Sequence, residues 1–280
     1  MEVDSAYKEA LDYAKNHYEN FPVVSVLVPK HLRKHVAIIY WFARTADDIA
    51  DEGSLSSDER IKMLDKFENR LLELLKGNFT SSFELALYTT IKVKNLSSDH
   101  FYSLLKAFKQ DVVKKRYENF YALLGYCQNS ANPVGRLILE LNEIRKSEAF
   151  EFSDKICTAL QLTNFWQDSA IDFAKGRIYY PEDEMQNFGV IEKMFELKEN
   201  NLNLKALVKH NVERTEKLFN EGNKLLEYLN GRLKYEIKWT ILGGRSILKQ
   251  IEKNNYNVLQ QRPALTKKDF FILLLKSFLK

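Results

Sequence analysis

The chain has 280 residues, of which 45% are hydrophobic and 29% charged, a composition typical of a globular protein. Its 42 basic and 38 acidic residues are interspersed, for a formal net charge of +4. So small an excess does not favour nucleic acid as a partner, although it suits an anionic substrate or an anionic membrane surface.

The two cysteines, Cys127 and Cys157, are isolated in the sequence. They form neither a metal-ligand spacing nor a disulfide framework, which favours a reducing compartment. The first residues lack the basic and apolar regions of a signal peptide, and no stretch reaches the roughly 18 apolar residues of a membrane span. We therefore expect a cytoplasmic protein.

Helical periodicity runs along most of the chain, which contains only 10 Gly and 5 Pro. The pattern predicts an all-α protein. In chain order the helices are expected at about 4–20, 30–51, 56–76, 82–94, 97–124, 133–150 and 153–176, then as short pieces within 182–201, and finally at about 202–229, 232–254 and from 266 onward. Without a repeat, low-complexity tract or linker, residues 1–280 are predicted to form a single domain.

The most informative stretch is residues 161–181. Asn164, Asp168 and Asp172 are spaced by four residues, which places three oxygen-bearing side chains in one column on a helix. Bulky neighbours such as Phe165 and Trp166 favour a partly enclosed column. Two carboxylates one turn apart repel each other, and a hard cation such as Mg²⁺ relieves that repulsion. A polar seam between two helices is the alternative interpretation.

A second acidic stretch covers residues 40–52. Four of its residues share one helix face by their spacing: Tyr40, Arg44, Asp47 and Asp51. Asp48 and Glu52 lie about one residue round from that face, where they would support the others or be solvated. Acids at the end of a helix are unfavourable with respect to its dipole, and a cation would offset this cost. A solvated helix end is the alternative interpretation.

The two stretches together indicate more than either does alone. Each places acidic oxygens one turn apart, and each carries a nearby arginine, Arg44 or Arg177. Two facing carboxylate clusters bridged by Mg²⁺ would form a clamp for a diphosphate, with the arginines neutralising phosphate oxygens.

These motifs resemble the squalene/phytoene synthase family of head-to-head trans-prenyl transferases. The resemblance covers nearly the whole chain and includes residues 40–52, 125–136, 161–181 and 260–263. Residues 130–135 and 164–168 look like the bacterial hopanoid-pathway branch that contains hydroxysqualene and squalene synthases. Carotenoid enzymes of the family usually have Arg at the position of Gln167.

The resemblance implies an all-α isoprenoid-synthase bundle with a central active-site cavity. It also implies a role for each matching residue. The expected metal ligands are Asp47, Asp51, Asn164, Asp168 and Asp172; the expected diphosphate contacts are Arg44, Arg177 and Arg262; and the residues expected to line the reacting region are Tyr40, Tyr126, Gln161 and Tyr179. One departure concerns residues 17–21, where relatives often have diphosphate-binding serines and this chain has Tyr18 and Asn20.

The implied reaction is the ionisation of presqualene diphosphate, with capture of the rearranged cation by water to give hydroxysqualene. Mg²⁺ is the expected cofactor and NADPH is not expected. Tyr126, Phe165 and Trp166 are candidates to face the cation in the cavity. One alternative is head-to-head condensation of two farnesyl diphosphates to presqualene diphosphate, squalene or dehydrosqualene. An alternative from another class is a non-catalytic helical assembly factor or lipid-binding scaffold.

The last apolar stretch, residues 270–275, is too short to cross a bilayer. It is expected to pack as a core helix. With Lys267, Lys268, Lys276 and Lys280 around it, it could instead rest on the inner face of a membrane. The oligomeric state is left open.

Overall fold

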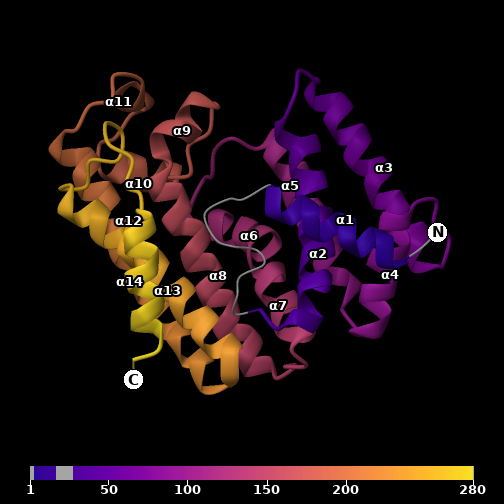
Figure 1. Cartoon of the computed structure of the whole chain (residues 1–280). Coiled ribbons are helices and arrows are strands. Elements are labelled where there is room, and N and C mark those ends of the chain that lie inside the picture. The colour runs from indigo at the N-terminus through magenta and orange to yellow at the C-terminus, as the bar shows by residue number, and fades with distance from the viewer. Residues whose placement is uncertain (1–2, 17–27, 280) are drawn as a thin grey trace. The chain divides into compact units, whose positions relative to one another are not determined.

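The computed structural model describes residues 3–16 and 28–279, and within these ranges the regular elements are helices without any β-strand (Figure 1). The predicted all-α class is confirmed. No helix in the same ranges is long and apolar enough to cross a membrane.

Contacts between Cα atoms divide the chain into two compact units. The first comprises Met1–Val113 with Pro133–Phe150, and the second comprises Lys114–Asn132 with Glu151–Lys280. That residues 1–280 act as a single domain with a central cavity stays a prediction.

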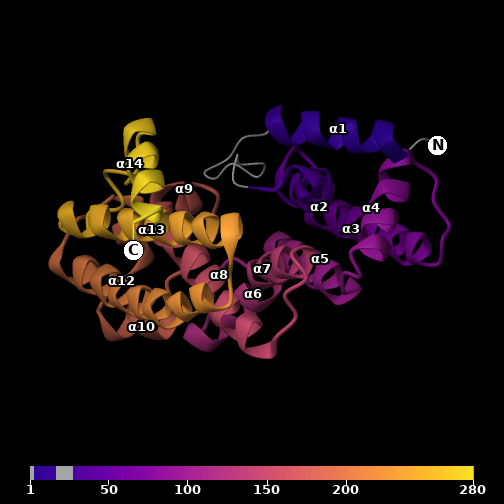
Figure 2. The same cartoon turned by 60° about the horizontal axis from the view of Figure 1, so that its bottom comes forward.

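The first unit is built on α2. Its helices are α1 (Val3–Asn16), α2 (Lys30–Asp51), α3 (Ser57–Leu75), α4 (Ser82–Val93), α5 (Ser98–Val113) and α7 (Asn132–Leu141, whose first residue belongs to the second unit). Helix α2 packs against α1, α3, α4 and α5, and α1 lies over α2 in the view of Figure 2. The helix that carries the first acidic motif is therefore held on several sides.

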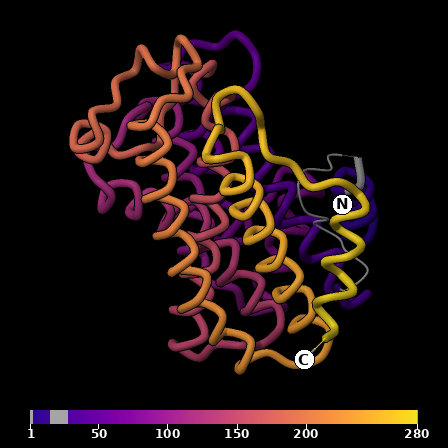
Figure 3. The backbone as a smooth tube through the Cα atoms, turned by 90° about the vertical axis from the view of Figure 1, so that its left-hand side faces the viewer, coloured from indigo at the N-terminus to yellow at the C-terminus, as the bar shows by residue number. Residues whose placement is uncertain are grey.

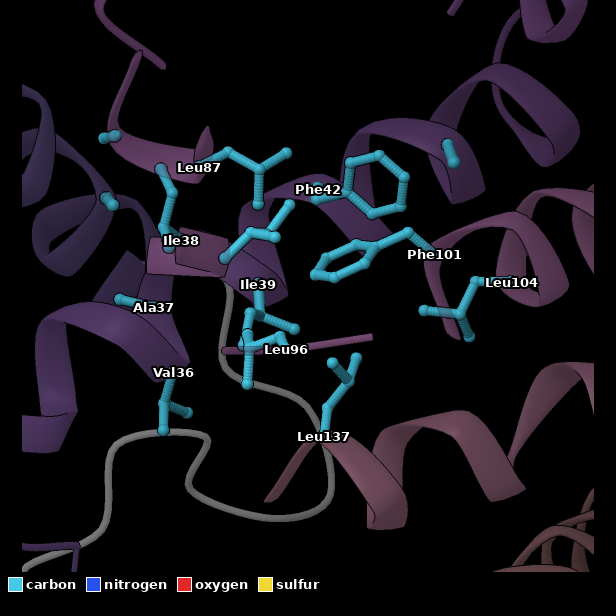
Figure 4. Packing of buried hydrophobic residues seen from close by; sticks show 14 of the residues in the cluster. Val36, Ala37, Ile38, Ile39, Phe42, Leu87, Leu96, Phe101, Leu104 and Leu137 are labelled. Atoms are coloured by element: carbon cyan, nitrogen blue, oxygen red, sulfur yellow. The ribbon is translucent and has the colours of Figure 1, made fainter. Parts of the chain in front are cut away.

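Aromatic and aliphatic side chains from these helices form the core of the first unit (Figure 4). The Phe42 ring of α2 meets Phe101 of α5 edge-on at a centroid distance of 5.2 Å and stacks on Phe67 of α3 at 5.1 Å. Ile38, one turn before Phe42, is fully buried. Burying this face of α2 leaves the opposite face to carry polar groups.

The end of α2 and the start of α3 each carry residues that cap a helix. Helix α2 ends at Asp51, and Gly53 adopts a φ of +79°, a left-handed conformation that glycine tolerates best. Ser56 and Glu59 form a reciprocal capping box at the start of α3. Both features lie between the helices expected at about 30–51 and 56–76, so the predicted position of this turn is confirmed.

The second unit contains the other helices. They are α6 (Phe120–Ser130), α8 (Ser147–Gln167, whose first turn belongs to the first unit), α9 (Ser169–Ala174), α10 (Glu182–Asn187), α11 (Glu192–Glu196), α12 (Leu202–Gly222) with the 3₁₀ turn η1 (Asn223–Glu227), α13 (Gly231–Lys253) and α14 (Lys267–Ser277). Helix α12 packs on α13, and α13 on α14. These three helices are the orange and yellow tube segments of Figure 3.

Several predicted helices are divided in the structure. The helix expected over 97–124 ends at Val113 because residues 115–118 bond to a distant segment. The carbonyls of Lys115 and Tyr117 accept hydrogen bonds from the backbone N–H of Ile178 at 3.1 Å and of Glu182 at 2.9 Å. The predicted break at 125–132 is also wrong, since most of it lies inside α6.

The helix expected over 133–150 ends at Leu141, and α8 begins at Ser147 rather than at residue 153. Glu143 takes a positive φ of +62° at this turn. Glu140 accepts a hydrogen bond from the Ser97 backbone N–H at 3.0 Å, and it forms an ion pair with Arg145 at 3.3 Å. These contacts hold the turn against the rest of the first unit.

Candidate active site

The first acidic motif lies on the last turns of α2 and is organised by Arg44. Its guanidinium lies 3.1 Å from Asp47 Oδ2 and 2.7 Å from Asp48 Oδ1. It also reaches Glu52 Oε1 at 2.5 Å. The Arg44 side chain is only 16% exposed. Its single positive charge is shared among these three acids. Asp48 and Glu52 therefore contact Arg44 directly and are not merely solvated.

Arg60 of α3 covers the end of α2. Its guanidinium donates hydrogen bonds to the carbonyls of Ile49 at 2.8 Å, Glu52 at 2.9 Å and Gly53 at 2.9 Å. These carbonyls carry the negative end of the helix dipole. Arg60 thus offsets the cost of placing acids there, and this cost alone does not require a metal.

Tyr40 and Asp51 lie at the two ends of the predicted column on α2. Tyr40 is half-buried, and its ring centroid lies 6.4 Å from that of Tyr13 on α1. The Tyr13 hydroxyl donates to Asp48 Oδ2 at 3.5 Å. Burial, followed by the nearby Asp48 charge, raises the pKa of Tyr13, so its phenol stays protonated. Asp51 is half-exposed one turn after Asp47.

The second acidic motif spans the junction of α8 and α9. The backbone N–H of Asp168 donates to the Asn164 carbonyl at 2.8 Å, and that of Asp172 donates to the Asp168 carbonyl at 2.8 Å. The helix is interrupted at Asp168, which has a φ of −100° and a ψ of 14°. Since bonds to the fourth preceding residue persist on both sides, the three residues keep their predicted spacing along one column.

Arg262 lies on Asp168, although the two residues are 94 positions apart in the sequence. Its Nε donates to Asp168 Oδ1 at 2.5 Å and its Nη2 to Oδ2 at 3.3 Å. Two N–H groups on two carboxylate oxygens form a bidentate, charge-assisted contact. The structure thus brings a predicted phosphate-binding arginine to a predicted metal ligand.

Gln167 and Pro263, the sequence neighbours of Asp168 and Arg262, form a second contact between the same two segments. Gln167 is buried, and its Nε2 donates to the Pro263 carbonyl at 2.7 Å. Consecutive residues at the end of α8 therefore bind consecutive residues of the chain after α13. We infer that Gln167 helps to place Arg262 beside Asp168.

Arg177 follows the turn that ends α9. Gly176 has a φ of +76°, and the backbone N–H of Arg177 donates to the Asp172 carbonyl at 2.8 Å. The Arg177 residue is 9% exposed. The backbone thereby holds the predicted phosphate contact next to the last acid of the motif.

Four buried aromatic rings gather beside α8. Phe165 and Tyr179 stack with centroids 3.6 Å apart and planes 8° from parallel. Tyr126 lies 6.0 Å from Phe165, and Tyr117 lies 5.9 Å from Tyr179. Gln161, one turn before Phe165, is partly exposed. The structure thus brings two predicted reacting-region residues, Tyr126 and Tyr179, to one aromatic cluster.

Trp166 has a different environment. Its ring has no exposed surface, and its Nε1 donates to Thr215 Oγ1 at 2.9 Å. It also stacks on Tyr180 at 4.8 Å, and the Tyr180 hydroxyl shares a 3.0 Å hydrogen bond with Ser169 Oγ. Burial raises the pKa of Tyr180, so this phenol stays neutral. The prediction that Trp166 faces a cavity is wrong: it anchors α8 to α12.

The donor atoms of the two motifs fit Mg²⁺ in their chemistry. They are carboxylate and amide oxygens, the hard ligands that Mg²⁺ prefers. They come from Asp47 and Asp51 on α2, and from Asn164, Asp168 and Asp172 at α8 and α9. Over residues 3–16 and 28–279, no group of three or more His, Cys, Asp or Glu side chains forms a metal-binding cluster. A magnesium site therefore stays a prediction.

Some features of the site lie beyond local sequence reasoning. Tyr18 and Asn20, the departures at the diphosphate-binding segment, lie outside the described residues. Tyr117 carries no sequence signal, since its place beside Tyr179 depends on the long-range backbone bonds of residues 115–118. Arg60 and Gln167 carry no spacing signal, since their partners are backbone carbonyls chosen by the fold.

The helical architecture and the two motifs, an Asp pair on α2 and an Asn/Asp column at α8 and α9, define an all-α isoprenoid synthase. The sequence profile of the family described as Squalene/phytoene synthase matches residues 14–269, and the chain belongs to this family. Members are synthases that use prenyl diphosphates, so the chain is an enzyme of that type.

Two relatives are hydroxysqualene synthases. The protein from Sinorhizobium fredii is 32% identical over 226 residues, covering 80% of this chain and 76% of the relative. The protein from Rhodopseudomonas palustris is 31% identical over 252 residues, covering 89% and 82%. The predicted family and its hopanoid-pathway branch are confirmed.

Solved structures share the fold. Squalene synthase HpnC from Alicyclobacillus acidocaldarius superposes with a TM-score of 0.86 at 35% identity, over 91% of this chain and 96% of that chain. A dehydrosqualene synthase in complex with a ligand gives a TM-score of 0.87 at 23% identity, over 98% and 96%. At the latter identity, the likeness concerns the fold alone.

Proposed function

We propose that this enzyme ionises presqualene diphosphate and captures the rearranged cation with water, giving hydroxysqualene. The similarity to two hydroxysqualene synthases over most of both chains carries this proposal. In balanced form, the carbon–oxygen bond to diphosphate breaks, the cyclopropylcarbinyl cation rearranges, and a water oxygen adds with loss of one proton. No reductant is consumed.

The acids and arginines are assigned to the leaving group. Bound Mg²⁺ would neutralise the charge that develops on the departing diphosphate. Its proposed ligands are Asp47, Asp51, Asn164, Asp168 and Asp172. Arg44, Arg177 and Arg262 donate to phosphate oxygens. Because Arg44 and Arg262 bind carboxylates in this structure, binding a diphosphate requires them to share or exchange partners.

The aromatic side chains are assigned to the hydrocarbon. A carbocation survives only where water is excluded until the productive step. The stacked rings of Phe165 and Tyr179, with Tyr126 beside them, offer π-faces that attract positive charge. Tyr40 and Gln161 complete the proposed lining and are polar enough to orient one water molecule.

A second candidate is the coupling of two farnesyl diphosphates to presqualene diphosphate, squalene or dehydrosqualene. The solved relative at 35% identity carries the name squalene synthase, which favours this candidate. Squalene formation would consume hydride from NADPH, whereas hydroxysqualene formation would not. The requirement for reductant therefore separates hydroxysqualene formation from squalene formation, and the products made from farnesyl diphosphate reveal the other two couplings.

Product analysis tests the proposal. Purified protein is incubated with Mg²⁺ and either presqualene diphosphate or farnesyl diphosphate, with and without NADPH, and lipids and released diphosphate are measured. The expected result is hydroxysqualene from presqualene diphosphate without NADPH, and no turnover after chelation with EDTA. Squalene formed only with NADPH, or presqualene diphosphate or dehydrosqualene formed from farnesyl diphosphate, would establish the second candidate. Absence of diphosphate release in every arm would contradict both candidates.

A further inference from the structure

Helix α14 exposes apolar side chains along one side. Together with Tyr235 of α13 they form a set that we term the α14 face: Tyr235, Phe271, Ile272, Leu275, Phe278 and Leu279. Each is between 37% and 66% exposed. Phe271, Leu275 and Phe278 follow the spacing of one helical face.

The opposite side of α14 already packs on α13. Leu273 and Ser277, one turn apart, are buried. Trp239 of α13 donates its Nε1–H to the Phe270 carbonyl at 3.1 Å, and the Tyr235 and Phe278 rings lie 4.8 Å apart. Figures 2 and 3 both show α14 beside α13. Helix α14 is therefore fixed on α13, and the α14 face remains exposed within this unit.

The exposed charged side chains of α14 itself are lysines. Lys267, Lys268 and Lys276 are exposed on the same helix. On a helical projection, Lys267 and Lys276 fall about 90° to either side of the apolar centre. Asp269 is the only acid of α14, and its carboxylate accepts the Thr266 N–H and hydroxyl in the capping box.

We propose that the α14 face binds the surface of an anionic lipid bilayer. An apolar helix side flanked by lysines is the pattern of helices that lie in the membrane interface, where rings and leucines enter the acyl boundary and ammonium groups meet lipid phosphates. Helix α14 has 11 residues, which suits lying in the interface rather than crossing the bilayer. This proposal is independent of the reaction proposed above.

Vesicle binding tests the proposal on the full chain. The protein is sedimented with vesicles of phosphatidylcholine alone or with 40 mol% phosphatidylglycerol, about the composition that gives a strong negative surface. Binding is expected to the anionic vesicles, and to weaken as salt is raised from low to physiological ionic strength. The variant Phe271→Glu/Leu275→Glu is expected to bind at least about tenfold more weakly.

A matched control adds the same charge at other exposed apolar positions. Tyr121→Glu/Leu202→Glu changes side chains that are 84% and 82% exposed near the starts of α6 and α12. It is expected to bind vesicles like the unaltered protein. Lys268→Glu/Lys276→Glu tests the charge separately and should also weaken binding to anionic vesicles by at least about tenfold, since each lysine contributes about fivefold. Circular dichroism confirms folding of every variant.

Three results would overturn the proposal. The unaltered protein could stay in the supernatant with anionic vesicles, or Phe271→Glu/Leu275→Glu could bind as well as the control. The unaltered protein could also form dimers that this double variant abolishes while vesicle binding is absent. The last result would assign the α14 face to a second copy of the chain.

Discussion

Asp168 is the residue at which several contacts of the second motif meet. Its backbone lies at the break between α8 and α9, and its carboxylate binds both Nε and Nη2 of Arg262. The Asp168 side chain is 14% exposed, so the pair lies near the surface of its unit without being fully solvated. A charge in such a place can exchange one partner for another when a ligand arrives.

Replacement of Asp168 by Asn should lower kcat by at least about 100-fold, because the amide keeps the shape and loses the negative charge that the proposed metal site needs. Diphosphate release measures the rate, and far-ultraviolet circular dichroism should be unchanged. Asp58→Asn, on the exposed first turn of α3, should retain full activity. Retained activity in Asp168→Asn would show that the proposed role of this acid is wrong.

Gln167 should stabilise the fold through Pro263. In Gln167→Leu the Nε2–H donor is lost and a buried carbonyl loses its partner, which costs about 1–3 kcal/mol of the free energy of unfolding. Urea denaturation measures this cost. Gln128→Leu, at an exposed position of α6, should cost less than about 0.5 kcal/mol. Equal stabilities of the two variants would contradict a tether at Gln167.

At the scale of elements, α8 depends on close contact with α12. Gly222, the last residue of α12, lies against Ile156 and Phe152 of α8. A Cβ added to Gly222 would lie 2.7 Å from Ile156 Cγ1 and 3.1 Å from the Phe152 carbonyl oxygen. Since one of these neighbours is backbone, the crossing has no room for a larger residue. Trp166, bonded to Thr215, ties the same two helices together.

Gly222→Ala should therefore destabilise the protein by about 1–3 kcal/mol, through overpacking of the helix crossing. Gly125→Ala is its matched control. Gly125 lies inside α6 with nothing within 4 Å of an added Cβ, so alanine there should stabilise by about 0.5–1 kcal/mol. Thermal and urea unfolding measure the stability of both variants. The expected result is a loss of stability in Gly222→Ala and a gain in Gly125→Ala. A stabilised Gly222→Ala variant would contradict the tight crossing.

At the scale of the whole molecule, stability is expected to depend on pH through His35. This residue of α2 is 5% exposed, and its Nδ1 lies 2.9 Å from Thr90 Oγ1 of α4. Tyr7 of α1 meets the same hydroxyl at 2.8 Å. Burial, followed by nearby Lys34 and other positive groups, lowers the pKa of His35 from 6.5 to about 4.

The sign of the effect follows from proton binding. Between pH 6.5 and pH 4 the unfolded chain binds a proton at His35 and the folded chain does not, so the free energy of unfolding falls as the pH falls. The loss should be on the order of 3 kcal/mol by pH 4 and absent above pH 7. Urea denaturation at several pH values in this range measures the free energy of unfolding. This free energy should fall less steeply with falling pH in His35→Leu than in the unaltered protein.

Local spacing by itself determined much of this protein. The helical class, the cap at Ser56 and the turn at Gly53 follow from residues within one or two turns of each other. The columns on α2 and at α8 and α9 are equally local, since a separation of three or four residues defines a helix face. The family motifs consist of such local patterns, which is why the class of enzyme could be predicted.

Only the tertiary structure decided the partners of these residues. Arg262 meets Asp168 across 94 positions, and Tyr117 joins Tyr179 because residues 115–118 bond to the backbone of residues 178–183. The same long-range bonds replace helical ones and divide the predicted helix at Val113. Trp166 turned out to be a packing anchor for the same reason. Contacts between distant residues depend on how whole helices pack, and no spacing along the chain records that packing.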